Sequence, residues 1–337
     1  MSSLSSSAPA RPANQTATGI AYGAAAGALW GLVFLAPKLV GDFGPLHLSA
    51  GRYLCYGLIA LALIAPRWRA LRPHISRRHW GQLCWLALAG NTLYYILLSS
   101  AVQIGGIAMT SLVIGFLPVA VTLVGSREHG AVPLRRMLPS MLLCALGALC
   151  IGWQALAAPV AGHAGQQLLG LACAVGALVS WTAFAIGNAR CLARLQQVSA
   201  HEWSLLTGLV TGAQSLLLIP LALLFETGDH GTQEWARFVG VSVAVALLAS
   251  VVGNAFWNRM SRLLPLTLVG QMILFETVFA LCYGLLWESR LPTLAEMAAF
   301  ACVVLGVLSC LAAHRQPVAR QPAPGAGACA AAQTPCP

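Results

Sequence analysis

Charged residues are scarce in this sequence of 337 residues, since they make up 8% of it while hydrophobic residues make up 58%. Soluble domains carry roughly a quarter charged residues, so the composition excludes most soluble folds. A helix that crosses a bilayer needs about 20 mostly apolar residues, and ten such helices occupy about 200 to 230 residues. The composition therefore predicts an all-α membrane protein with little chain left for a soluble domain.

Motifs for ATP use, metal binding and catalysis are missing. Lys38 is the single lysine and Leu39 follows it, so no Gly-Lys-Ser/Thr phosphate-binding loop exists. The eleven cysteines show no Cys-X-X-Cys or Cys/His ligand spacing, and most lie inside apolar runs. No Ser/His pair, paired aspartates or His-Glu-X-X-His motif is present. We therefore expect no enzyme, no cofactor and no metal site.

Apolar runs predict ten membrane-spanning helices joined by short loops. The predicted spans are residues 19–40, 46–66, 79–101, 104–124, 133–156, 166–190, 201–225, 236–258, 267–287 and 292–314. Only Gln103 to Gly106 separate the third span from the fourth, and a merged helix would be far longer than a bilayer requires. The Pro- and Ala-containing ends, residues 1–18 and 315–337, are predicted to be disordered cytoplasmic tails.

Basic residues are distributed unevenly between the two sides of these spans. With both tails inside, the cytoplasmic side receives Arg11, Arg67, Arg69, Arg72, Arg77, Arg78, Arg127, Arg135, Arg136, Arg190, Arg194, Arg259, Arg262, Arg315 and Arg320, and the outer side receives Lys38, Arg52, Arg237 and Arg290. Basic residues resist translocation, so this bias predicts that both termini are cytoplasmic. The net charge of +10 is then explained without a nucleic-acid partner.

The two halves of the chain resemble each other. A shift of 159 positions pairs Gly125 with Gly284, Pro133 with Pro292, Leu146 with Leu305, and Gly147 with Gly306. Each half contains five predicted spans, an odd number, so the halves would insert with opposite topology. We therefore predict two inverted five-helix repeats, residues 19–156 and 166–314, which meet around a site near the membrane midplane.

Several segments resemble a known family. They are Gly27-Ala-Leu-Trp-Gly with Lys38 closing the span, Leu117-Pro-Val, and Phe275-Glu-Thr-Val-Phe-Ala running to Leu286-Trp-Glu. These segments look like the two EamA repeats of the drug/metabolite transporter superfamily, and the resemblance covers nearly all of residues 20–314. It implies a membrane carrier. Asn254-Ala-Phe-Trp-Asn258 is similar to YddG-like exporters of aromatic and other neutral amino acids, whereas Glu276 stands where those sequences tend to have an uncharged residue.

Uncharged polar residues interrupt the apolar runs on particular helix faces. An unsatisfied polar group in hydrocarbon costs several kcal/mol, so these faces should point inward. We predict that Asn91 and Tyr95 in the third span, Ser111 in the fourth, Asn254 in the eighth and Gln271 in the ninth bind substrate. The alternative for each is an interhelical hydrogen bond that only holds the bundle together.

Aromatic residues also lie well inside the predicted spans. Trp30 and Phe34 belong to the first span and Trp181 to the sixth, so they cannot serve as interfacial anchors. Their rings would offer large apolar area to a substrate. Core packing is the alternative, although the resemblance implies that the sixth-span tryptophan lines the central cavity.

Two ionisable residues inside the spans are candidates for function. Glu276 is the one acidic residue deep in a span, so it is a candidate for binding a substrate ammonium group or for carrying a proton, with a structural role as the alternative. Arg52 lies one to two turns inside the second span, where it would pair with a substrate carboxylate or, as we expect, snorkel to the outer interface.

These features predict an inner-membrane secondary transporter that exports neutral or aromatic amino acids and related small metabolites by alternating access. Its partners are the lipid bilayer and the small-molecule substrate, and Glu276 makes proton coupling a hypothesis. The alternative is a multidrug exporter, because an aromatic cavity with one carboxylate also suits lipophilic cations. An intramembrane enzyme or a structural membrane protein fits less well.

Overall fold

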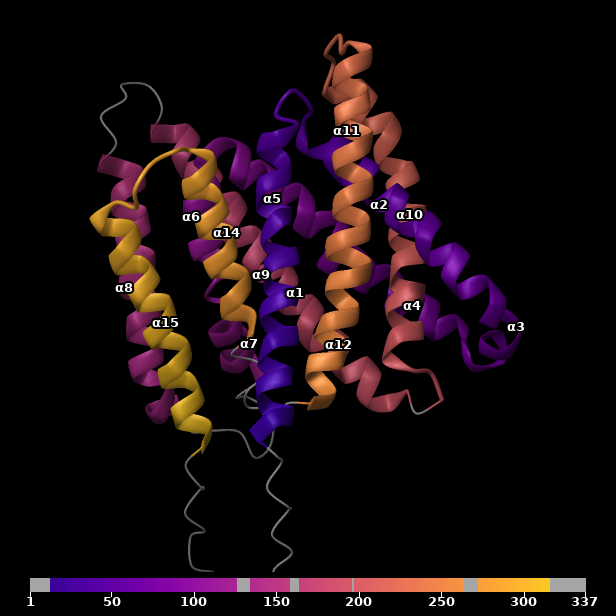
Figure 1. Cartoon of the computed structure of the whole chain (residues 1–337), viewed down its shortest axis with the longest axis horizontal. Helices are drawn as coiled ribbons and strands as arrows, with labels where there is room; N and C mark the ends of the chain where they lie inside the picture. Colours follow the sequence, from indigo (N-terminus) through magenta and orange to yellow (C-terminus); the bar gives the residue numbers. More distant parts are fainter. Residues whose placement is uncertain (1–12, 126–133, 158–163, 196, 264–271, 316–337) are drawn as a thin grey trace, which may run out of the picture.

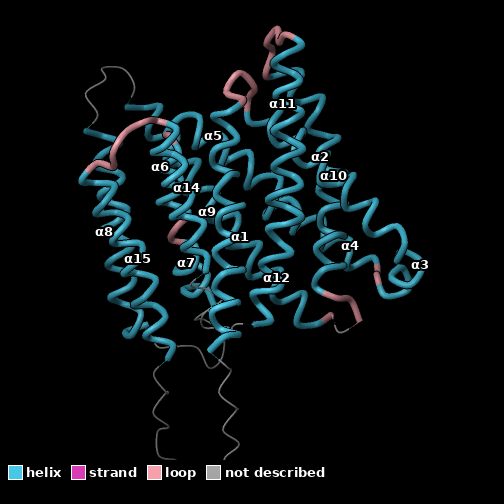
Figure 2. The backbone as a smooth tube through the Cα atoms, viewed as in Figure 1, coloured by secondary structure: helices cyan, strands magenta, loops and turns pink. Residues whose placement is uncertain are grey.

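The computed structural model describes residues 13–125, 134–157, 164–195, 197–263 and 272–315. Every regular element within these ranges is helical (Figure 2). Six helices are long and apolar enough to cross a membrane, and four shorter apolar helices accompany them. The all-α membrane fold predicted from composition is therefore confirmed.

The helices follow the predicted spans closely. In the first half they are α1 (Ala13–Leu39), α2 (Pro45–Ile64), α3 (Trp68–Leu71), α4 (Arg77–Ala87), α5 (Leu93–Gly105), α6 (Ile107–Ile114), α7 (Leu117–Gly125) and α8 (Leu134–Ala157). In the second half they are α9 (Ala164–Arg194), α10 (Ala200–Phe225), α11 (Thr232–Val245), α12 (Asn254–Leu263), α14 (Ile273–Trp287) and α15 (Leu294–Arg315). One boundary needs correction, because α1 begins inside the segment 1–18 that we expected to be a disordered tail.

Two breaks shape the third and fourth predicted spans. Gly106 has a φ of 87°, a conformation that favours glycine, and it ends α5 and starts α6. This confirms the predicted separation of the two spans. The fourth span is itself divided into α6 and α7 at Gly115 and Phe116. Pro118 then lies in the first turn of α7, where its missing N–H breaks no helical hydrogen bond.

Glycines allow two pairs of helices to approach closely. A Cβ atom on Gly27 would lie 2.6 Å from Cβ of Phe275, and one on Gly31 would lie 3.0 Å from the backbone nitrogen of Ala280, so α1 packs against α14 along its glycine stripe. A Cβ on Gly57 in α2 would lie 2.6 Å from Cα of Gly212 in α10. These are backbone contacts of the kind that small residues permit in membranes.

Two π-helical segments interrupt the third and eighth predicted spans. The segment η3 (Leu88–Thr92) connects α4 to α5, and η4 (Ala246–Gly253) connects α11 to α12. π-helical turns are rare and occur frequently at functional sites. Their recurrence in the third span of each half places two unusual backbone segments inside the bundle.

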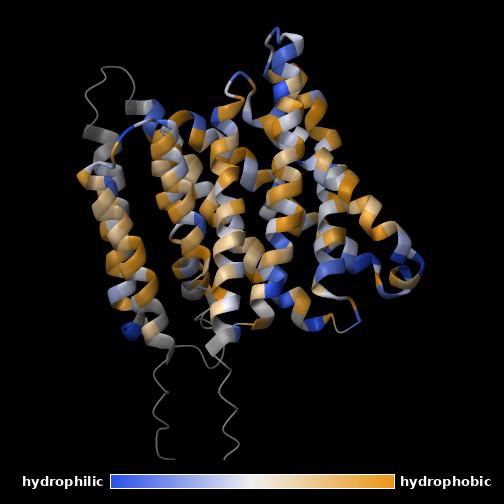
Figure 3. Cartoon of the chain, viewed as in Figure 1, coloured by the Kyte–Doolittle hydropathy of each residue, from blue (hydrophilic) through white to orange (hydrophobic). Residues whose placement is uncertain are grey.

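The arrangement of the bundle is visible in Figure 1. The helix α1 stands near the centre, α8 and α15 pack against each other at one edge, and α2, α10 and α4 pack together toward the other. The described chain begins and ends at the same end of the bundle. Hydrophobic residues fill the middle of the helices and hydrophilic residues gather toward their ends (Figure 3), as expected for a protein that spans a membrane.

Candidate functional site

Four of the predicted site residues belong to, or pack against, one hydrophobic core cluster of the bundle. Phe34 and Tyr95 are fully buried in it, and Trp30 and Trp181 pack against it partly buried. These residues come from α1, α5 and α9, so both halves of the chain contribute. Their convergence agrees with the predicted location of the site, while substrate binding by these rings stays a prediction.

Side chains from the opposite half reach both π-helical segments. Trp30 Nε1 in α1 donates a hydrogen bond of 3.0 Å to the carbonyl oxygen of Ala249 in η4. Ser180 Oγ in α9 donates one of 2.7 Å to the carbonyl oxygen of Ala89 in η3. Aromatic rings also cover the glycines of these segments, since a Cβ on Gly253 would meet the ring of Trp30 and one on Gly90 would meet that of Phe184. Each half therefore supports the irregular helix of the other.

Arg52 is buried in this region, with 9% of its surface exposed. Its Nη2 donates to Ser250 Oγ at 3.3 Å, and its Cζ lies 4.4 Å from the ring centroid of Tyr95 and 5.1 Å from that of Tyr53. Its Nε and Nη1 are buried, and neither has a hydrogen-bond partner among the described residues. The expectation that Arg52 snorkels to the outer interface is therefore wrong, because α2 turns this residue toward α5 and η4 rather than toward lipid.

Glu276 lies in the first turn of α14, opposite the glycine stripe of α1. Its side chain is partly buried, and no hydrogen bond or ion pair to it is found within the described residues. Arg52 is the basic residue that acts on it electrostatically. An unpaired charge in the interior costs several kcal/mol, which makes both residues functional candidates rather than packing residues.

The remaining predicted polar residues make local or interhelical hydrogen bonds. Asn91 Nδ2 donates to Thr211 Oγ1 in α10 at 2.9 Å. This interaction is the interhelical hydrogen bond expected if Asn91 only holds the bundle together. Asn254 Nδ2 donates to the carbonyl of Ser250 at 2.7 Å within its own helical segment. The hydroxyl of Ser111 donates a hydrogen bond to the carbonyl oxygen of Ala108 in its own helix α6. Gln271 lies outside the described residues.

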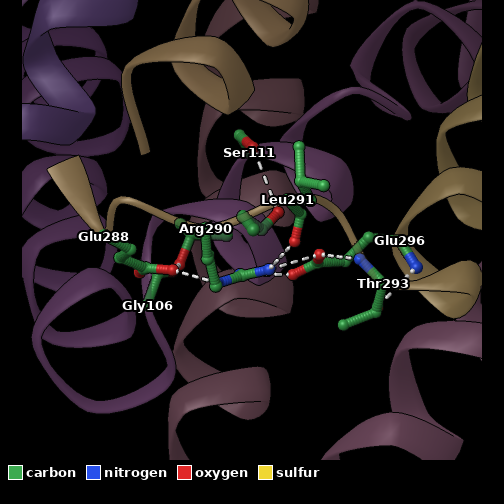
Figure 4. A network of polar contacts seen from close by, with 9 residues as sticks. Gly106, Ser111, Glu288, Arg290, Leu291, Thr293 and Glu296 are labelled. Atoms are coloured by element: carbon green, nitrogen blue, oxygen red, sulfur yellow. Dashed lines mark hydrogen bonds and ion pairs between the residues drawn. The ribbon is translucent and has the colours of Figure 1, made fainter. Parts of the chain in front are cut away.

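An ion-pair network closes the loop between α14 and α15 (Figure 4). Arg290 binds both carboxylate oxygens of Glu296, at 2.6 and 2.7 Å, and its Nε binds Glu288 at 2.6 Å. Glu296 also accepts a hydrogen bond from the backbone of Thr293, while Gly106 lies next to Glu288. The network fixes this loop beside the break between α5 and α6.

A second network ties the start of α2 to the end of α10. The carboxylate of Glu226 accepts hydrogen bonds from the backbone nitrogens of Leu46 and His47 at 2.8 and 3.0 Å and lies 2.7 Å from Nδ1 of His47. A carboxylate at a helix N-terminus satisfies free N–H groups and favours the helix dipole. Beside it, the ring of Phe43 stacks between His230 and Phe238. The loop before α2 is thus held to the second half.

Comparison with known proteins identifies the family. The chain matches the EamA-like transporter family over residues 17–153. It is 32% identical over 303 residues to the inner membrane protein YtfF of Escherichia coli (strain K12), covering 86% of this chain and 94% of YtfF. The chain belongs to the EamA-like transporter family. A crystal structure of another protein, 22% identical, superposes with a TM-score of 0.60 over 89% of this chain and 98% of that chain, which shows a shared fold.

Membership of the EamA family confirms the resemblance to the drug/metabolite transporter superfamily. The family is one of transporters. The names of the relatives do not specify a substrate. The similarity of residues 254–258 to amino-acid exporters therefore remains a basis for a proposal.

Proposed function

We propose that this EamA-family protein is a ten-span carrier of two inverted repeats that exports neutral or aromatic amino acids and related small metabolites by alternating access. The observation that carries the proposal is the reciprocal support of η3 and η4. Trp30 of the first half bonds to η4, and Ser180 of the second half bonds to η3, while one hydrophobic core cluster includes residues of both halves. A transporter of inverted repeats is expected to hold irregular helices at the interface of its halves.

The helix contacts support the inverted repeat. An inverted repeat predicts that each helix contact has an equivalent contact in which every helix is replaced by its counterpart in the other half. The equivalent of the contact between α1 and α14 is the contact of α9 with α6 and α7. The equivalent of the contact between α5 and α9 is the contact between α12 and α1. The contacts of α2 with α10, of α6 with α14 and of α8 with α15 map onto themselves. All these contacts are present, which is the pattern that a pseudo-twofold axis produces.

The distribution of charge supports cytoplasmic termini. The described chain starts and ends at one end of the bundle, and the basic connection around α3 lies toward the same end (Figures 1 and 3). The positive-inside rule assigns that end to the cytoplasm. The similarity to the inner membrane protein YtfF supports a location in the inner membrane.

The composition of the site supports a neutral substrate with an apolar side chain. Tryptophan, phenylalanine and tyrosine rings supply apolar area, and Ser250 and Asn254 add uncharged polar groups. Exchange of labelled leucine, phenylalanine and serine by proteoliposomes that contain the purified protein tests the proposal. We expect exchange of at least one of them, inhibited by excess unlabelled amino acid. Transport of a lipophilic cation such as tetraphenylphosphonium with none of the three exchanged would favour the multidrug alternative.

We further propose that Glu276 couples export to protons. A zwitterion carries no net charge, so its movement alone gains nothing from the membrane potential, and accumulation needs a group that titrates. We expect Glu276→Gln to retain exchange but to lose accumulation driven by a pH gradient. Accumulation by the Gln variant would exclude this role, and a wild-type protein that ignores the gradient would be a facilitator.

A further inference from the structure

The guanidinium of Arg52 is buried with most of its hydrogen-bonding capacity unused. Nε carries one N–H and Nη1 carries two, and both atoms lack an acceptor within the described residues. Its other contacts are with neutral groups, namely the hydroxyl of Ser250, the ring faces of Tyr53 and Tyr95, and a hydrogen bond with the side chain of Tyr95. A ring face attracts the charge, yet it gives the in-plane N–H groups no acceptor.

The position of Arg52 excludes an ordinary anchoring role. It lies seven residues after Pro45, about 10 Å along α2 from the start of that helix. Two other helical segments face it, since Tyr95 belongs to α5 and Ser250 to η4. Arg237 and Arg290, also assigned to the outer side, instead form ion pairs, Arg237 with the exposed Asp42 and Arg290 with Glu288 and the buried Glu296.

A charge of opposite sign lies in the same interior, also without a partner. Glu276 comes from α14 in the second half of the chain, whereas Arg52 comes from the first. The two interact electrostatically but form no ion pair, since no nitrogen of Arg52 lies within 4.0 Å of an oxygen of Glu276. One buried guanidinium and one carboxyl group, on opposite halves and not paired with each other, match a ligand that carries both charges.

We propose that Arg52 and Glu276 recognise the two charged ends of an α-amino acid, with Arg52 binding the carboxylate and Glu276 the ammonium group. This inference rests on the proposed function and specifies its substrate determinant. The guanidinium offers several N–H donors to a carboxylate, which is the pairing that arginine geometry favours. Ser250 and the tyrosine rings position the guanidinium, and the apolar cluster receives the substrate side chain.

The first test uses the wild-type protein and altered substrates. The amino acid that exchanges fastest among leucine, phenylalanine and serine is compared with its carboxamide, which lacks the negative charge, and with its deaminated acid, which lacks the positive one. Loss of a charge-assisted hydrogen bond corresponds to a fall of at least about tenfold in affinity. We expect both analogues to compete at least about tenfold more weakly than the amino acid. Equal competition by the carboxamide would overturn the role of Arg52.

The second test identifies which of the two residues binds the carboxylate of the substrate and which binds the ammonium group. Arg52→Gln should weaken binding of the amino acid and abolish its advantage over the carboxamide, while the advantage over the deaminated acid persists. Glu276→Gln should show the converse pattern. Arg237→Gln is the matched control, because it removes an outer-side arginine that pairs with Asp42 at the surface, and it should keep both advantages.

The outcomes separate the inference from the proposed function. If the wild-type protein exchanges none of the three amino acids, the proposed function is wrong and the inference is lost with it. If it exchanges one of them and Arg52→Gln still disfavours the carboxamide, the inference alone is wrong. A purely structural Arg52 would lower exchange of all ligands equally. Should Arg52→Gln fail to fold, Arg52→Lys keeps the charge with fewer donors, and it should raise KM for the amino acid but not for the carboxamide.

Discussion

The reciprocal support of the two π-helical segments leads to a quantitative prediction. Ser180→Ala removes the hydroxyl that donates to the carbonyl of Ala89, and Trp30→Phe removes the indole N–H that donates to the carbonyl of Ala249 while retaining an aromatic ring. Neither substitution introduces a charge or a larger side chain. Both should therefore lower the free energy of unfolding without preventing folding.

The expected magnitude follows from the environment of the two carbonyl groups. Interhelical hydrogen bonds in membrane proteins contribute about 0.6 kcal/mol on average and about 1.7 kcal/mol at most. Ser180→Ala should lie within this range. Trp30→Phe should cost more, about 1–3 kcal/mol, because the indole also covers Gly253 and lies 4.9 Å from the ring of Trp257.

Ser100→Ala provides the matched control for this prediction. The hydroxyl of Ser100 donates to the carbonyl of Ile96 in its own helix, at 2.8 Å, so its removal leaves no contact between helices unmade. The free energy of unfolding is measured in mixed micelles by titration with sodium dodecyl sulfate. If Ser180→Ala and Trp30→Phe fall within about 0.3 kcal/mol of Ser100→Ala, the π-helical segments do not depend on the opposite half and the reasoning is refuted.

Three further predictions concern topology and packing. A reporter active only in the cytoplasm should be active when fused after His314 and silent within residues 157–165, and the reverse would overturn the orientation. Gly57→Ala should lower the free energy of unfolding by about 1–3 kcal/mol, because its Cβ would overlap the backbone of α10. Gly81→Ala, which has open space around it, should raise the free energy of unfolding by up to about 1 kcal/mol. Equal effects of the two substitutions on unfolding in micelles would contradict this prediction. Glu226→Ala should cost about 1–2 kcal/mol in the same assay, since it exposes N–H groups at the start of α2, and an unchanged free energy would show that water replaces the carboxylate.

The positions of the helices were accessible from the sequence because they depend on local properties. An apolar run of bilayer length forms a helix in lipid wherever it occurs, since every backbone group must be satisfied internally. The break between α5 and α6 was predictable because one helix through both spans would be far longer than a bilayer requires, and Gly106 provides it with a φ that favours glycine. The four-residue spacing of Gly27 and Gly31 is typical of a close helix contact, but it does not identify α14 as the partner.

The site was only partly predictable because its chemistry depends on which helices meet. Arg52 is buried because α2 packs against η4 and α5. From the sequence, the short distance of Arg52 from the start of its helix favoured snorkelling to the outer interface. Asn91 makes a hydrogen bond to Thr211 that no local pattern indicates. A signal for the π-helical segments was present, however, because Gly90-Asn91 and Gly253-Asn254 place the same pair of residues at η3 and at the end of η4.

The same contacts indicate where the two halves can move against each other. Along the glycine stripe, the backbones of α1 and α14 approach closely, and the hydroxyl of Tyr283 in α14 donates a hydrogen bond of 3.2 Å to the carbonyl oxygen of Ala28 in α1. At η3 and η4, each half likewise holds a carbonyl of the other through a directional hydrogen bond. Under the proposed alternating access, a rocking motion that preserves these bonds must pivot near them, next to the hydrophobic core cluster that contains Tyr95. The proposed site would then lie near the pivot, where a substrate changes its access from one side to the other with little displacement of its own.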